Sequence, residues 1–158
     1  MATGIPASAS GEGRIIAAVP GLYEIRHDHA LEIIRVGGIG IQRVEDADRY
    51  LAELGRTVAA MRARIGVVRL LADLRNSPVR SQPVAERIRL GNLSLYRPGD
   101  RVALLVESSL MKMQLRRNLV PEYQNIFMSV NAAETWLTAH DDVSPFSGLA
   151  RGSAALSA

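Results

Sequence analysis

The sequence VEDADRYLAELGRTVAAMRARIGVVRLLAD, residues 44–73, contains the two elements that define the class of fold. Its first part predicts one helix, Val44–Ile65, which Gly66 ends, because apolar side chains recur at alternate steps of four and three. The stripe that they form consists of Ala47, Leu51, Leu54, Val58, Met61 and Ile65. The second part, Val67–Asp73, is short and mostly apolar, as in a strand covered on both faces. A long amphipathic helix followed by a buried strand indicates an α/β fold.

Two strands are predicted ahead of this helix. Tyr23, Ile25 and His27 alternate with polar residues, and Leu31–Val36 is apolar and β-branched, so the two segments favour an antiparallel hairpin. Residues 1–20 are rich in Ala, Gly and Ser and lack the charged and apolar regions of a secretory signal. We expect them to form a flexible N-terminal extension, because they offer little apolar surface to bury.

Downstream, helices and strands continue to alternate. The predicted elements are a helix over about Gln82–Leu90 with Ser81 as a candidate cap, a strand over Val102–Val106, a third helix capped by Ser108 or Ser109, a strand over Ile126–Val130, and a last helix that Asn131 and Glu134 begin. Residues 143–158 are expected to form a flexible tail. The sequence thus predicts a single α/β domain over residues 21–142, with a mostly parallel five-stranded sheet, an N-terminal antiparallel hairpin and about four helices.

The amino-acid composition excludes several classes of function. The 158 residues are 47% hydrophobic, enough for a single core, and no apolar run approaches the roughly 18 residues of a membrane span, so stable membrane insertion is not expected. The chain has no cysteine, which excludes disulfides, thiol nucleophiles and iron–sulfur clusters, and we expect a cytoplasmic protein. The net charge of +3 is spread along the chain and only 4% of the residues are aromatic, so nucleic acid is not an expected partner.

Residue patterns that would carry catalysis or a cofactor are incomplete. Gly38 and Gly40 lie between a strand and a helix, but Arg43 stands where a dinucleotide fingerprint needs its third glycine. His27 and His29 have the spacing of two metal ligands on one face of a strand, yet a third imidazole would have to come from the far end of the chain. The serines that follow predicted strands are explained as helix caps. The sequence therefore predicts no enzyme, no cofactor and no metal site.

The segment from Asp73 to Gln82 is the main candidate for a functional surface. Asp73 ends the central strand, at the carboxyl edge where open sheets of this class place their binding sites. A loop and the start of a helix follow, and the free N–H groups of a helix start favour an anion or a phosphorylated side chain. We predict that Asp73, Ser77, Arg80, Ser81 and Gln82 contact a partner. The alternative is that Asp73 only bonds the loop and Ser81 only caps the helix.

Short phrases along the chain resemble a known family. The phrases "LLADLR" at Leu70–Arg75, "RVALLVESSLMKMQLRR" at Arg101–Arg117 and "NAAETWL" at Asn131–Leu137 resemble the bacterial SpoIIAA-like proteins of the STAS class, over about Tyr23–Ala139. This resemblance implies a regulatory or protein-interaction domain without enzymatic activity. In one branch of the family, a partner kinase phosphorylates the first serine of an Asp-Ser-Ser-Gly motif. That motif is missing here, and Gln82 stands near the position of the phosphorylated serine.

The SpoIIAA-like branch is also similar in fold to CRAL-TRIO lipid-transfer domains, which implies an alternative function. The chain would then carry or sense a small hydrophobic ligand in a cleft between its second and third helices. Leu90, Leu93, Met111 and Met113 are the predicted walls of that cleft, because methionine and leucine side chains adapt to apolar ligands. The expected partner is thus another protein or a small apolar ligand, and a homodimer is also open.

Overall fold

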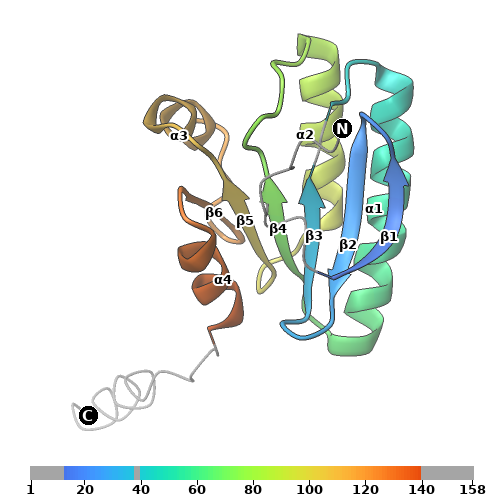
Figure 1. The fold of residues 1–158 in the computed structure, drawn as a ribbon, viewed down its shortest axis with the longest axis vertical. Coiled ribbons are helices and arrows are strands. Elements are labelled where there is room, and N and C mark those ends of the chain that lie inside the picture. Colours follow the sequence, from blue (N-terminus) through green and yellow to red (C-terminus); the bar gives the residue numbers. More distant parts are fainter. Residues whose placement is uncertain (1–12, 38–39, 140–158) are drawn as a thin grey trace, which may run out of the picture.

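The computed structural model describes residues 13–37 and 40–139 (Figure 1). In this part of the chain, six strands form one sheet in which each strand lies beside the next in sequence. The β1–β2 and β2–β3 pairs are antiparallel, and the strands from β3 to β6 are parallel, so the sheet is mixed. The strands are β1 (Arg14–Val19), β2 (Tyr23–Asp28), β3 (Ile33–Gly37), β4 (Arg69–Asp73), β5 (Arg101–Leu105) and β6 (Gln124–Phe127).

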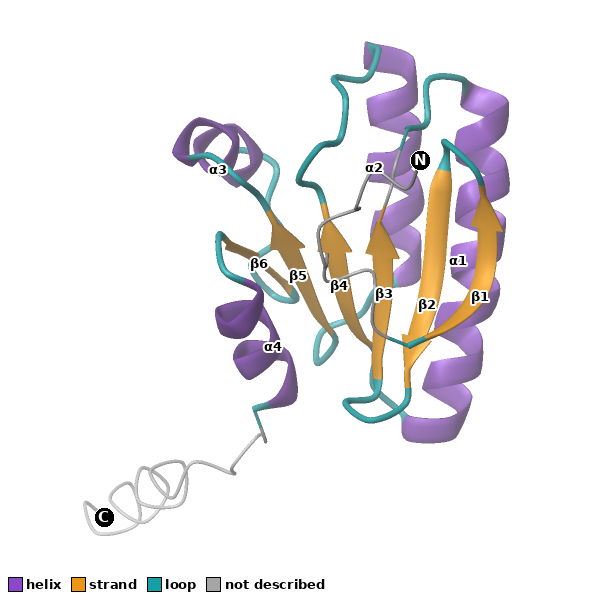
Figure 2. Ribbon diagram, in the orientation of Figure 1, coloured by secondary structure: helices purple, strands orange, loops and turns teal. Residues whose placement is uncertain are grey.

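Four helices cover the two faces of the sheet unequally. Figure 2 shows α1 (Val44–Ile65) and α2 (Gln82–Leu95) side by side behind the sheet, whereas α4 (Val130–Thr138) lies on the other face and contacts β4, β5 and β6. The fourth helix, α3 (Ser109–Arg116), lies beyond the ends of β5 and β6. Each parallel crossover therefore contributes one helix, as expected for an α/β domain.

Alternate residues of the central strand serve the two faces. In β4, Leu70 and Ala72 pack into the core beneath α1 and α2, and Leu71 packs into a second, smaller core beneath α4. This is the period of two that a strand imposes on its side chains. The prediction that this strand is covered on both faces is confirmed.

The longest helix has the bounds that the sequence predicts. Of its apolar stripe, Leu51, Leu54, Val58 and Met61 are buried against the sheet, while Ile65 at the end of the helix is 39% exposed. Gly66 follows with a positive φ and donates its N–H to the carbonyl of Arg62, which is the expected way to end a helix.

The first strand corrects the predicted extension. Residues 14–19 belong to the sheet and pair with β2, so the sheet has six strands and not five. Most of β1 is exposed at the sheet edge, and its sequence lacks the apolar alternation of a half-buried strand. A turn signal was nevertheless present, because Pro20 and Gly21 (φ 78°) form the middle of a turn closed by a hydrogen bond from Leu22 to Val19.

Other predicted boundaries also shift. α2 continues past Leu90 to Leu95, and β6 ends at Phe127 before the predicted Val130. The last helix is capped by Ser129, whose Oγ accepts a hydrogen bond from Ala132 N, so Asn131 lies inside the helix. The predicted capping partner of Asn131, Glu134, instead reaches across to the buried Arg35 at 2.7 Å.

The predictions for residues 1–12 and for the tail over residues 143–158 fall outside the described residues, as does His140, the histidine at the far end of the chain. Within the described ranges, none of the helices is both long enough and apolar enough to cross a membrane.

Candidate functional site

A pocket of about 350 Å³ lies at the carboxyl edge of the parallel strands, with walls from α2 and α3. After β4 ends at Asp73, the chain crosses a loop of residues 74–81 and enters α2. Open α/β sheets bind ligands beyond the carboxyl ends of their strands, and this pocket has that place in the fold.

The sheet and both helices give the pocket an apolar lining. Ala72 and Leu104 are register partners on β4 and β5, and both face the core beneath α1 and α2. Ile88 comes from α2, Leu115 from α3 and Leu74 from the start of the loop. These five side chains would contact the apolar part of a ligand.

The polar feature that distinguishes the pocket is Arg80, which approaches it from the loop. Its Nε atom is shielded from solvent and has no hydrogen-bond partner within residues 13–37 and 40–139. Among the described residues, no hydrogen bond or ion pair involves the Arg80 side chain. Burial lowers the pKa of Arg80, because desolvation disfavours the charged form of a guanidinium. A partly buried cation without an anionic partner is unusual, since buried charges are normally paired.

Tyr50 of α1 lines the same pocket and interacts electrostatically with Arg80. Its ring is 4% exposed and packs on Tyr23 at 5.4 Å between centroids. Burial raises the pKa of the Tyr50 hydroxyl, so the phenol stays protonated and can donate a hydrogen bond. Gln82, Asn92 and Asn118 add further polar groups to the lining.

The acidic residue of the lining does not neutralise Arg80. Glu86 makes a two-bond ion pair with Arg89, with oxygen–nitrogen distances of 2.7 and 2.9 Å. Both residues are about half exposed. Hydrogen bonds from Arg89 lower the pKa of Glu86, so this carboxylate is ionised but already engaged. The pocket therefore offers a free positive charge beside an apolar floor.

The predicted partner surface divides into two groups in the structure. Arg80 and Gln82 line the pocket. Asp73 does not, because it follows Ala72 along the strand and its side chain lies on the opposite face. Asp73 is buried and accepts hydrogen bonds from the backbone N–H, Nε and Nη2 of Arg75 at 2.9–3.1 Å. It holds the start of the loop, as the alternative interpretation expected.

The two serines of this segment also have defined positions. Ser81 occupies the N-cap position of α2, but its side chain makes no capping hydrogen bond and is exposed. Ser77 is partly buried, and its Oγ has no hydrogen-bond partner among the described residues. Neither serine lines the pocket.

The four apolar residues predicted for the alternative ligand cleft do not line this pocket either. Leu90, Leu93 and Met113 are 48%, 42% and 63% exposed, and Met111 is half-buried. The pocket does lie between the second and third helices, but α2 presents a different face to it. Ala85, Ile88 and Asn92 follow each other at steps of three and four and form that face.

The chain matches no protein-family model, no curated protein and no solved structure. The resemblance to the STAS class stays a prediction from the sequence.

Proposed function

We propose that the protein binds a small organic anion with an apolar body in the pocket between α2 and α3, and acts as a carrier or sensor of that ligand. The observation that supports this most strongly is the unpaired Arg80. In a protein interior, a charged group that has left water and has no partner costs roughly several kcal/mol of folding free energy. A carboxylate on the ligand would provide the missing partner through charge-assisted hydrogen bonds.

The lining indicates what kind of anion fits. One guanidinium and one phenol suit a group with a single negative charge, such as a carboxylate, better than a dianionic phosphate. Ala72, Leu104 and Ile88 would contact an aliphatic or aromatic body. The volume of about 350 Å³ lies near the lower end of the roughly 300–1,000 Å³ found for small-molecule sites, which favours a short acid over a full-length lipid.

Binding rather than catalysis is proposed because the described lining contains hydrogen-bond donors and apolar side chains but no histidine or serine. Its carboxylate, Glu86, is held by Arg89. The site can hold and orient an anion, and it presents no pair of groups arranged as nucleophile and base.

A regulatory role is the second candidate, and one feature of the loop favours it. Val79, which precedes Arg80 in the loop, presents an apolar side chain that is 94% exposed. Since Arg80 borders the pocket, a bound anion would fix the same loop that carries Val79. A partner protein of the kind that the STAS resemblance implies would then bind a loop surface whose conformation depends on whether the ligand is bound.

Calorimetric titration of the full-length protein with octanoate and with 1-octanol tests the proposal. Octanoate should bind more tightly by about tenfold or more, because one hydrogen bond to a charged group contributes roughly 1.5–3 kcal/mol. The Arg80→Gln variant should lose this discrimination without losing folding stability, because the substitution removes a partly buried charge that has no partner among the described residues. Arg116→Gln, an exposed arginine of α3 outside the lining, is the matched control and should bind like the wild type.

Equal affinity of the wild type for octanoate and 1-octanol would contradict the proposal. So would a marked loss of stability in Arg80→Gln without ligand, since that would show Arg80 to be a structural residue with a partner in the protein.

A further inference from the structure

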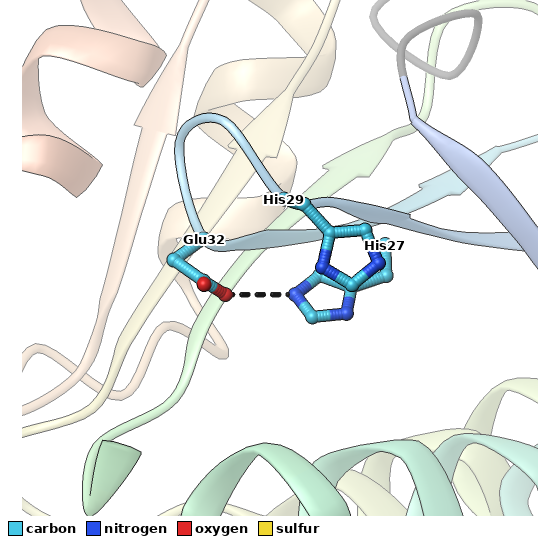
Figure 3. A group of neighbouring side chains, drawn as sticks. All are labelled: His27, His29 and Glu32. Atoms are coloured by element: carbon cyan, nitrogen blue, oxygen red, sulfur yellow. Dashed lines mark hydrogen bonds and ion pairs between the residues drawn. The ribbon is translucent and has the colours of Figure 1, made fainter. Parts of the chain in front are cut away.

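A second cluster of side chains lies at the turn between β2 and β3, at the edge of the sheet opposite to the ligand pocket. Figure 3 shows the imidazole rings of His27 and His29 beside each other and Glu32 directed at His27. The two ring centroids are 3.9 Å apart, and the ring planes are tilted by 39°. The nearest oxygen of Glu32 lies 2.9 Å from Nε2 of His27. The possible ligand atoms of the three residues all lie within 4.8 Å of one another.

The turn that carries these residues is anchored to the core. Asp28 Oδ1 accepts hydrogen bonds from the backbone N–H groups of Ala30 and Leu31, which closes the turn. Asp28 Oδ2 is bound by the fully buried Arg35 at 2.8 and 3.2 Å. Glu32 has a φ of 54°, a conformation that L-residues seldom adopt and that persists where the surroundings fix it. The three side chains are thus held near one another before any ligand arrives.

We propose that His27, His29 and Glu32 form a binding site for a divalent transition-metal ion such as Zn²⁺. Two imidazoles and one carboxylate are a donor set that suits zinc, nickel and copper better than magnesium or calcium. A metal ion would take the place of the direct contact between His27 Nε2 and Glu32, and His29 would supply the third bond. The prediction from the sequence considered only another histidine as the third ligand and not Glu32, which the hairpin brings next to His27.

Arg64, in the last turn of α1, controls access to the carboxylate. Its two terminal nitrogens lie 3.0 and 2.8 Å from the oxygens of Glu32, and Nη2 is 3.2 Å from His27 Nε2. The Arg64 side chain is 49% exposed, so it can release Glu32 into a metal bond and remain solvated. Arg64 competes with the metal for Glu32, and its removal therefore raises metal affinity.

Titration of untagged full-length protein with Zn²⁺ by calorimetry tests this proposal, together with the visible absorption of bound Co²⁺. The wild type should bind one ion. His29→Ala and Glu32→Gln should weaken binding by about tenfold or more, while Arg64→Gln should strengthen it. His140→Ala changes the only other histidine of the chain and should leave the affinity unchanged.

Two results would overturn the proposal. One is the absence of saturable Zn²⁺ binding to the wild type at millimolar concentration. The other is binding that survives His29→Ala and falls with His140→Ala. Because His29 is exposed, His29→Ala should keep the wild-type melting temperature without metal, which separates loss of the site from loss of the fold.

Discussion

Asp100 provides the sharpest test of how the fold is held together. Its side chain is 1% exposed and accepts hydrogen bonds from four N–H groups. Two come from Arg62 at the end of α1, at 3.0 and 2.8 Å. The others come from the backbone of Val68, just before β4, and of Arg97, at 3.0 and 2.9 Å. One carboxylate therefore ties the end of α1 to the starts of β4 and β5.

The substitution Asp100→Asn keeps the size and removes the charge. An asparagine has one acceptor oxygen, and its NH2 group would face donors instead of acceptors. Removing one member of a buried ion pair typically costs 3–5 kcal/mol, and the 17% exposure of Arg62 places the expected loss near the lower end, at about 3 kcal/mol. Urea unfolding at neutral pH measures this loss, with Glu122→Gln, an exposed acid, as the control.

The loss of stability in Asp100→Asn should depend on pH in a definite direction. Burial by itself would raise the pKa of Asp100, but the hydrogen bonds from Arg62, Val68 and Arg97 together outweigh it and lower that pKa. The stabilisation is present above the unfolded pKa of about 3.9 and is lost as the pH falls through the lower folded value. The difference in unfolding free energy between wild type and Asp100→Asn should therefore shrink below about pH 4. A loss under about 1 kcal/mol at neutral pH, the scale of a surface ion pair, would refute this reasoning.

Three further substitutions test particular parts of the fold. Leu54→Ala should reduce the unfolding free energy by about 2–5 kcal/mol, because Leu54 is 1% exposed on the face of α1 that packs on the sheet; a loss under about 0.5 kcal/mol in urea unfolding would show an unpacked face. Gly40→Ala should lower the melting temperature strongly, because a Cβ would lie 2.2 Å from the carbonyl oxygen of Gly21, a backbone atom; an unchanged melting temperature would refute this contact. Ser129→Ala should cost about 0.5–2 kcal/mol and Asn131→Ala clearly less, and the reverse order in chemical denaturation would restore Asn131 as the cap.

The sequence predicts an element well where side-chain burial alone specifies it. The bounds of α1 agree with its apolar stripe because one whole face of the helix is buried. β1 could not be predicted in this way, because its backbone hydrogen bonds to β2 hold it at the sheet edge while its side chains stay largely exposed. The cap of α4 was misplaced because Asn131 and Glu134 have the spacing of a capping box, while Glu134 is drawn to the buried Arg35 from a distant strand.

The candidate site also has a part that the sequence predicts and a part that it does not. The strand order predicts that the loop after the carboxyl end of β4 borders the candidate site. Arg80, a residue of this loop, does line the pocket. That Arg80 has no partner in the part of the chain that the structure describes could not be foreseen, because it depends on which carboxylates the fold brings near. Asp73 is taken by Arg75 and Glu86 by Arg89, so the nearest acids in sequence are both occupied. Tyr50 was missed since its position on α1 is that of an ordinary core residue.

The most direct test of the account is to map the ligand contact on the full-length protein by backbone amide chemical shifts during titration with octanoate. The proposed function predicts saturable shifts that cluster at Ala72–Leu74, along the α2 face around Ile88, and at Leu115–Asn118 of α3 and the turn after it. In Arg80→Gln, the same amides should shift only at octanoate concentrations about tenfold higher or more, because the charged hydrogen bond is lost while the apolar lining remains. Shifts that scatter over the surface, or that cluster around Arg64 and survive in Arg80→Gln, would contradict the claim that Arg80 and this pocket form the binding site.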